Sequence, residues 1–213
     1  MKRVVVLISG RGSNMEALLR ARLPATVAAV ISSEPGAPGL ATARSQGITT
    51  VSIDHRAHPD RADFDTTLGR EIDRHDPDLV VLAGFMRVLT ESFVQRYAGR
   101  LINIHPSLLP AFPGLNTHRR ALEAGARIHG CTVHFVTPAL DGGPIIVQAA
   151  VPVLSGDTES ALAARVLAQE HRIYPQAVCW FCDGRIMLSP DGRVAVAGTT
   201  AVDQALVSPP LSA

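Results

Sequence analysis

The sequence has few aromatic residues, few cysteines and almost no net charge, and each shortage argues against a class of function. Aromatic residues make up 4% of the 213 residues, too few for the stacking platforms that hold single-stranded nucleic acid. Lysine and arginine number 20 against 19 acidic residues, so the net charge of +1 suggests no face built for nucleic acid. Three cysteines are too few, and odd in number, for a disulfide framework.

Long apolar runs are also lacking, and none approaches the roughly 20 residues of a membrane span. The run VVVLIS follows Met-Lys-Arg and resembles the core of a signal peptide. It soon meets GRGSN, however, instead of a small-residue cleavage site. We therefore predict a first strand at this position and a cytoplasmic protein with no membrane or nucleic-acid partner.

Two of the cysteines, Cys179 and Cys182, form a C-x-x-C. A zinc site would need a second pair. A redox pair would follow a strand in a thioredoxin-like unit. These two residues instead lie late in the apolar helical stretch YPQAVCWFCDG, so we expect buried, inert thiols.

Apolar runs of strand length alternate with helical stretches through the first half of the chain. The predicted strands cover residues 3–9, 26–32, 49–53, 78–84 and 100–105. The predicted helices cover residues 13–21, with Ser13 as N-cap, 40–47, closed by Gly47, 61–75 and 90–97. Because the strands are apolar on both faces, we predict an α/β fold with a doubly wound, mostly parallel sheet covered by helices on both sides.

The hydrophobic pattern is different in the second half of the chain. GCTVHFVT (130–137) alternates, and PIIVQAAVPV (144–153) follows the turn ALDGG, which predicts an antiparallel hairpin added to the sheet. A long helix is expected over about 157–181, and GRIML with GRVAVAG would form a last short hairpin. We expect one domain over residues 1–188, followed over 189–213 by a short hairpin and a frayed or disordered tail.

The loop SGRGSN joins the first predicted strand to the first helix, where backbone N–H groups and the helix dipole favour an anion. It is not the dinucleotide fingerprint, because the third glycine would fall at Met15, and it lacks the Lys-Ser/Thr pair of a nucleoside-triphosphate loop. Two interpretations stay open. The N–H groups of Gly12, Ser13 and Asn14 hold one phosphate, or the loop is a tight turn that binds nothing.

A polar pair stands at the end of the fifth predicted strand. Ligands of doubly wound sheets bind beyond the carboxyl ends of the strands. Asn103 and His105 are two residues apart, so their side chains point to the same side. The amide offers a donor, and the imidazole offers a proton near neutral pH. Pro106, Pro110 and Pro113 stiffen the loop that follows. A single histidine in a loop is more often structural, and this pattern alone does not decide the matter.

The third candidate is Asp141 in ALDGGP. An aspartate before two glycines usually makes a turn, although the glycines also let the backbone approach a ligand. If the hairpin folds back beside the fifth strand, Asp141 reaches His105, raises the pKa of the imidazole and keeps it cationic. A cationic histidine beside an amide suits stabilisation of a tetrahedral oxyanion and proton delivery to a leaving amine.

Two other chemistries have weaker support. A Ser-His-Asp hydrolase would need a G-x-S-x-G elbow, which the sequence lacks, and Ser107 beside His105 has no evident oxyanion loop. The eight histidines show no H-E-x-x-H or comparable cluster, so we expect no metal.

Five longer stretches together resemble the folate-dependent formyltransferases over roughly residues 2–188. They are VVLISGRGSNMEALL, PDLVVLAGFMRVL, LINIHPSLLPAFPGLNTHRRALEAG, GCTVHFVTPALDGGPIIVQ and ARVLAQEHRIYP. The Asn-x-His motif with a distal Asp is shared by the wider family, whereas G-x-G-S-N is more specific because it resembles a site for a substrate phosphate. The resemblance implies a Rossmann-like fold, and transfer of the formyl group of 10-formyltetrahydrofolate to the amine of glycinamide ribonucleotide in purine biosynthesis.

The resemblance also implies roles for individual residues. Asn103, His105 and Asp141 match the catalytic trio, with His105 as proton donor and Asp141 raising its pKa. The residues that match the substrate site are Gly12, Ser13, Asn14 and Glu170. The residues that match the folate site are Arg61, Met86, Arg87, Val88, Leu89, Asn103, Thr137, Pro138, Ala139, Leu140 and Asp141. Phosphate binding then falls in the N-terminal half of the domain and folate binding in the C-terminal half.

Two positions depart from the pattern of the family. Leu167 stands where some relatives have a polar residue, so contacts from that turn are expected to differ. Pro138 stands where an acid is common, which is expected to stiffen the loop and leave its backbone contacts in place.

Other activities stay open beside this one. A formyl-folate deformylase would carry an additional N-terminal regulatory domain, and the first predicted strand begins at residue 3. A methionyl-tRNA formyltransferase would carry a C-terminal domain, and only about 25 weakly patterned residues follow the 188-residue region. A nucleotide-binding regulatory module would use the glycine loop without chemistry. We expect small-molecule substrates and a monomer or weak homodimer.

Overall fold

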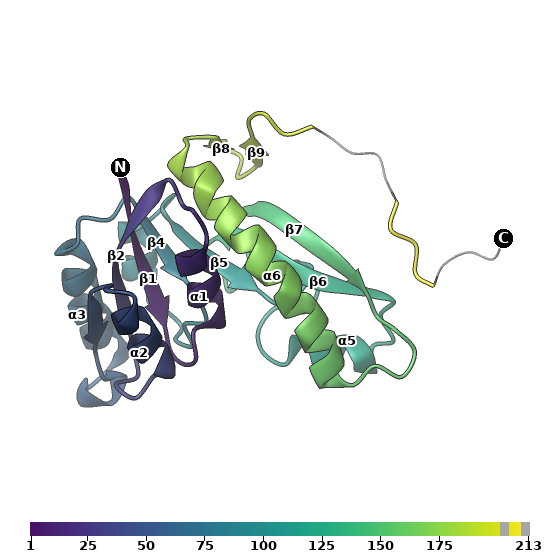
Figure 1. The fold of residues 1–213 in the computed structure, drawn as a ribbon, viewed down its shortest axis with the longest axis horizontal. Coiled ribbons are helices and arrows are strands. Elements are labelled where there is room, and N and C mark those ends of the chain that lie inside the picture. Colours follow the sequence, from purple (N-terminus) through teal and green to yellow (C-terminus); the bar gives the residue numbers. More distant parts are fainter. Residues whose placement is uncertain (201–204, 210–213) are drawn as a thin grey trace. The chain divides into compact units, whose positions relative to one another are not determined.

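The computed structural model describes residues 1–200 and 205–209 of the chain (Figure 1). By its internal contacts the chain divides into two compact units. Unit 1 contains Met1–Asn103 and Phe135–Ala139, and unit 2 contains Ile104–His134 and the chain from Leu140 onwards. The expected single domain over 1–188 stays a prediction. The predicted disordered tail falls in part on 201–204 and 210–213, which lie outside the described residues.

Unit 1 alternates strands with helices, as the apolar pattern predicts. Its elements are β1 (Lys2–Ile8), α1 (Ser13–Arg20), β2 (Ala25–Ser32), α2 (Pro38–Ser45), β3 (Thr50–Ser52), the 3-10 turn η1 (His55–Ala57), α3 (Arg61–Asp73), β4 (Leu79–Leu82), α4 (Glu91–Arg96) and β5 (Leu101–His105), whose last two residues belong to unit 2. All four strand pairings in this part, β1 with β2, β1 with β4, β2 with β3 and β4 with β5, are parallel.

Unit 2 contains the predicted hairpins and the long helix. Its elements are α5 (Thr117–Glu123), β6 (Ile128–Phe135, whose last residue belongs to unit 1), β7 (Ile145–Pro152), α6 (Glu159–Cys182), β8 (Ile186–Leu188) and β9 (Val194–Val196). The pairs β6–β7 and β8–β9 are antiparallel, and α6 packs against β7 (Figure 1). The sequence pattern does not identify α5, because seven residues show too little of a helical period.

The strand order of the main sheet is β3-β2-β1-β4-β5-β6-β7, and β8 and β9 form a separate two-stranded sheet. This order confirms the predicted mostly parallel α/β sheet with an antiparallel addition. In β1, Val4 and Val5 are 1% and 0% exposed although they point to opposite faces, as expected of a strand covered on both sides. Among the described helices, none combines the length and the apolar character that a membrane span requires.

Two local predictions are wrong. Ser13 is not the N-cap of α1. Gly12 occupies that position with φ 76° and no side-chain cap bond, because glycine lets the chain enter the helix through a left-handed residue. Cys179 and Cys182 are half-buried instead of buried, because the whole last turn of α6 is partly exposed. Both are free thiols, and Cys131 is the buried one.

Candidate active site

His105 and Asp141 lie side by side in unit 2. His105 is the last residue of β5, and Asp141 lies in the connection between β6 and β7. The imidazole Nδ1 is 3.4 Å from the carboxylate Oδ2, and the two side chains are 7% and 9% exposed. This connection therefore folds back to the end of β5 and places an acid against a largely buried ring.

The backbone around Asp141 aims its carboxylate. Asp141 has a left-handed φ of 51°, which aspartate tolerates better than most residues. Its Oδ2 accepts a hydrogen bond from the N–H of Gly114 at 2.8 Å. Its Oδ1 lies 3.9 Å from Nε2 of His134, a side chain that is 2% exposed. The carboxylate is thus held between two histidines and a backbone N–H.

His134 is a site residue that the sequence analysis missed. It lies on β6, and the alternation of GCTVHFVT puts it on the same face as Thr132. The alternation indicates a strand, and nothing in it indicates that Asp141 comes within reach.

The ring of His105 faces two acceptors. Nδ1 faces the carboxylate of Asp141, and Nε2 lies 3.0 Å from the backbone carbonyl oxygen of Phe112. Neutral imidazole has one N–H, whereas imidazolium has two. Nε2 is at hydrogen-bond distance from its acceptor, whereas the 3.4 Å between Nδ1 and Oδ2 is longer than a normal hydrogen bond and suits an ion pair when the ring is protonated.

Asn103 precedes His105 by two residues on β5 and is half-buried. Alternation along the strand puts its carboxamide on the same side as the imidazole. An amide N–H donor and an imidazole N–H donor on one side of a strand end can stabilise negative charge that develops on a single oxygen.

The glycine loop belongs to unit 1 and leads directly into α1. The N–H of Glu16 donates to the carbonyl of Gly12 at 2.8 Å, the first bond of the helix. The N–H groups of a first helical turn have no acceptor within their own helix and favour an anion. The loop is supported by α2, where Gly39 donates its N–H to the carbonyl of Gly10 at 3.2 Å. A Cβ at Gly39 would lie 2.7 Å from the side chain of Ile8, so the packing there requires glycine.

The first predicted folate segment, Met86 to Leu89, is anchored at both ends within unit 1. The N–H of Met86 donates to Ser9 Oγ at 2.9 Å, and the N–H of Thr90 donates to Asp65 Oδ2 at 2.6 Å. Between the anchors, Arg87 and Leu89 are half-buried, while Met86 and Val88 are 66% and 57% exposed. A rigid backbone that presents apolar side chains suits the face of a flat ring system.

The remaining predicted residues fall in both units. Arg61, the exposed first residue of α3, belongs to unit 1, as do Thr137, Pro138 and Ala139. Leu140 begins the next part of unit 2 and is exposed.

Glu170 lies in the middle of α6, in unit 2, and is buried. Burial raises the pKa of the Cys131 thiol to about 12, and the charge of Glu170 adds to this effect. Leu167, one turn earlier on α6, is half-buried. The carboxylate of Glu170 therefore lies beside β6, in a sparsely solvated part of unit 2.

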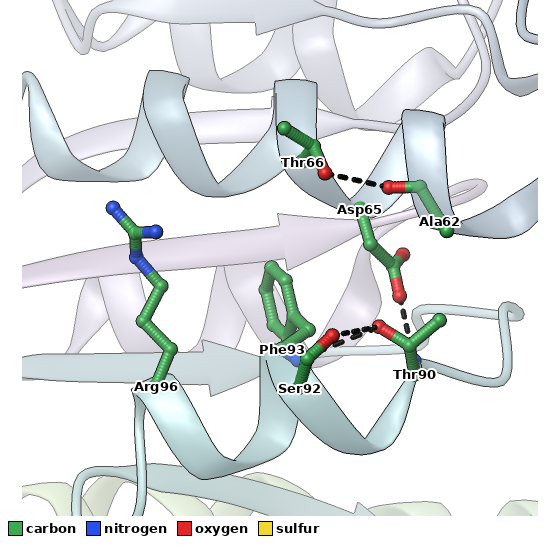
Figure 2. A pocket seen from close by; sticks show the side chains of 7 residues that line it. All are labelled: Ala62, Asp65, Thr66, Thr90, Ser92, Phe93 and Arg96. Carbon is green, nitrogen blue, oxygen red and sulfur yellow. Dashed lines mark hydrogen bonds between the residues drawn. The ribbon is translucent and has the colours of Figure 1, made fainter.

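A separate cavity of about 240 Å³ lies between α3 and α4 in unit 1 (Figure 2). Figure 2 shows Asp65 reaching from α3 to the backbone of Thr90, at the start of α4. The residues that line the cavity are Ala62, Asp65, Thr66, Thr90, Ser92, Phe93 and Arg96. It contains none of the residues predicted from the sequence to bind or react. In the part of the chain that the structure describes, no three His, Cys, Asp or Glu side chains are grouped as metal ligands would be.

The chain has close relatives among known proteins. The profile of the formyl transferase family matches residues 2–178. Phosphoribosylglycinamide formyltransferase of Escherichia coli (strain K12) is 54% identical over 189 residues, which cover 87% of this chain and 89% of that protein. The trifunctional purine biosynthetic protein adenosine-3 of Drosophila melanogaster is 47% identical over 196 residues, which cover 89% of this chain and 14% of that protein. The crystal structure of glycinamide ribonucleotide transformylase 1 from Symbiobacterium toebii matches with a TM-score of 0.89 and 48% identity, over 92% of this chain and 94% of that one.

Proposed function

The chain belongs to the formyl transferase family, and we propose that it transfers the formyl group of 10-formyltetrahydrofolate to the amine of 5-phosphoribosylglycinamide in purine biosynthesis. The observation that carries the proposal is the close approach of His105 Nδ1 to Asp141 Oδ2, at 3.4 Å, with Asn103 two residues before His105 on β5. This set of donors suits the chemistry of formyl transfer, and the relatives supply the identity of the substrates.

The reaction begins when the glycinamide amine attacks the formyl carbon and the carbonyl electron pair moves onto oxygen. The Nδ1–H of His105, whose 3.4 Å approach to Asp141 is longer than a normal hydrogen bond, and the amide of Asn103 donate to this oxyanion, and Asp141 stabilises the imidazolium charge of His105. The attacking nitrogen loses a proton, and the folate nitrogen gains one as the carbon–nitrogen bond to the folate breaks. Asp141 orders the water through which that proton passes, and no covalent enzyme intermediate forms.

The substrate phosphate binds at the start of α1, to the backbone N–H groups of Gly12, Ser13 and Asn14. The start of α1 directly after Gly12, with no side-chain cap, supports this assignment, because the first N–H groups of a helix have no acceptor within the helix. Glu170 binds the sugar or glycinamide end of the same substrate.

The folate lies against two backbone segments. One is Met86 to Leu89, whose anchored backbone and exposed apolar side chains suit a pterin face. The other is Thr137 to Asp141, and Arg61 interacts with the acidic end of the folate.

The activity is tested by following folate absorbance with purified protein and 10-formyltetrahydrofolate, with and without the ribonucleotide. Dependence on the ribonucleotide supports transfer, whereas consumption without it identifies hydrolysis, and no consumption in either case identifies a binding module.

His105→Ala tests the catalytic role of the histidine. We expect kcat to fall by about 10²- to 10⁴-fold, the usual loss when a general acid is removed. His75→Ala is the control, because His75 is a half-buried histidine of unit 1 that pairs with Glu71 at 3.3 Å. Full activity in His105→Ala would remove His105 from the mechanism.

Asn14→Ala tests the phosphate site. The variant is expected to raise KM for the ribonucleotide more than KM for the folate, because the buried Asn14 side chain supports the first turn of α1 that presents the backbone N–H groups of that site. An equal rise in both constants would show that the phosphate binds elsewhere.

A further inference from the structure

One turn contacts both members of the His105–Asp141 pair. This turn, residues 112–116, leads from the proline-rich loop into α5. The carbonyl of Phe112 faces His105 Nε2 at 3.0 Å, and the N–H of Gly114 donates to Asp141 Oδ2 at 2.8 Å. A shift of the 112–116 turn therefore moves an anchor of the imidazole and an anchor of the carboxylate together.

The φ/ψ preferences of its own residues do not stabilise the backbone conformation of the 112–116 turn. Phe112 has φ 53°, Gly114 has φ 78° and Asn116 has φ 55°. Glycine adopts this region freely and asparagine tolerates it, but a bulky residue such as phenylalanine rarely does. Such a residue persists there only when its surroundings hold it.

The side chain that holds the 112–116 turn is Arg120, from the second turn of α5. Its Nη1 donates to the carbonyls of Pro113 and, at 3.4 Å, Leu115, on either side of Gly114. Its guanidinium carbon lies 5.7 Å from the centroid of the Phe112 ring, within the range of a cation–π contact. His129 meets the same ring edge-on, with centroids 5.8 Å apart.

We propose that Arg120 is a positioning residue for catalysis, which sets the geometry of His105 and Asp141 through the 112–116 turn. The inference rests on the proposed role of that pair in formyl transfer. Without the guanidinium, Phe112 relaxes toward a negative φ, its carbonyl leaves Nε2, and the N–H of Gly114 moves away from Asp141. The imidazole and the carboxylate remain present but lose their alignment.

The test compares Arg120→Met with Arg119→Met. Arg119 is the neighbouring arginine on α5, is exposed, and approaches Glu123 at 3.9 Å, so its variant makes the same change of charge away from the turn. We expect Arg120→Met to lower kcat by roughly tenfold, since small misplacements of reacting groups are costly, with both KM values within about twofold of the starting protein. Arg120→Lys, which keeps the cation, is expected to recover most of that loss.

A second measurement separates positioning from stability. In ¹⁵N spectra of the histidine rings, Arg120→Met is expected to shift the His105 signals, and Arg119→Met is expected to leave them in place. Arg120→Gln, which removes the guanidinium from the Phe112 ring but stays polar, takes the place of the methionine variant if that variant does not fold. Unchanged His105 signals, an unchanged kcat in a folded variant, or an equal loss in Arg119→Met would overturn the inference.

The same assays distinguish this inference from the proposed function. If His105→Ala keeps its activity, the proposed role of the pair fails, and the role of Arg120 fails with it. If His105→Ala is inactive while Arg120→Met turns over normally, only the positioning role is refuted.

Discussion

Replacing Asp141 with asparagine removes one charge from the pair and changes almost nothing in shape. The Nδ1 to Oδ2 separation is 3.4 Å, and both side chains are less than a tenth exposed. At that distance and an effective dielectric constant of about 20, opposite unit charges attract by about 5 kcal/mol. Asparagine still offers an oxygen to the ring or to Gly114, so only part of this attraction is lost. A loss of about 2 to 4 kcal/mol predicts that kcat falls by about 30- to 1,000-fold.

The assay for Asp141→Asn is kcat with both substrates saturating, measured from pH 5 to 9. In the proposed mechanism the wild-type carboxylate stabilises the positive charge of the imidazole that donates to the oxyanion. If the carboxylate acts by its charge, the variant is expected to retain relatively more of its activity at acid pH than the wild-type protein does. The direction of this pH effect follows from the positive charge proposed for the imidazole, and it does not depend on how far kcat falls.

Asp157→Asn is the control for the loss of a buried aspartate charge. Asp157 also lies in unit 2, its side chain is 5% exposed, and it pairs with Arg165 at 2.7 Å. This variant is expected to lose stability and keep kcat. If Asp141→Asn stays within about threefold of the wild-type kcat, the electrostatic account of the pair is refuted. A large loss with an unchanged pH profile would mean that Asp141 acts by shape and not by charge.

Two further predictions concern the surroundings of the site. Burial lowers the pKa of His129 from 6.5 to about 4, with a smaller contribution from His118, so the folded protein keeps this ring neutral. The free energy of unfolding is therefore expected to fall as the pH drops from about 6.5 to about 4, with His129 contributing at most about 3 kcal/mol. Denaturant titrations at several pH values should show that the unfolding free energy of His129→Gln depends less steeply on pH than that of the wild-type protein. Gly39→Ala places a Cβ 2.7 Å from Ile8 and 3.1 Å from the carbonyl of Gly10, so we expect a loss of about 1–3 kcal/mol in denaturant titration and a raised KM for the ribonucleotide. An unchanged KM in a destabilised Gly39→Ala protein would show that the shape of the glycine loop does not control substrate binding.

Most of the sheet is readable from the sequence. Strands β1, β2 and β4 contain long apolar runs, and β5 is apolar apart from Asn103 and His105. The four observed strands agree with the predicted ones to within two residues at each end. A strand buried on both faces can be recognised from the sequence because most of its positions are apolar. The short helix α5 carries no such signal, because a helix of seven residues shows less than two turns of its period.

The cap of α1 and the thiols of α6 show two limits of local patterns. A serine before an apolar helical stretch favours an N-cap, but a glycine in the left-handed region can occupy the same position without a side chain. The apolar stretch around Cys179 and Cys182 predicts burial, yet burial depends on what packs against the end of the helix. Neither the N-cap of α1 nor the exposure of the two thiols can be predicted from the neighbouring residues alone.

The sequence by itself determined the parts of the candidate site that depend on neighbours along the chain. The spacing of Asn103 and His105 puts both on one side of a strand end, and the order strand, glycines, helix puts Gly12 at the start of α1. Backbone geometry relates residues that are close in sequence, so these relations hold wherever the elements are placed.

Only the tertiary structure decided which distant groups meet. Residues that reach His105 or Asp141 from other segments include the carbonyl of Phe112, the N–H of Gly114, the ring of His134 and, through the 112–116 turn, Arg120. Nearly every residue has the same backbone N–H and carbonyl groups, so the sequence does not show which of them will contact the site. The conformation of a loop also depends on the packing of the elements that the loop joins. The sequence pairs Asp141 with His105 only on the condition that the hairpin folds back, and a family resemblance implies the same pair, but the 3.4 Å contact and its anchors exist only once the chain has folded.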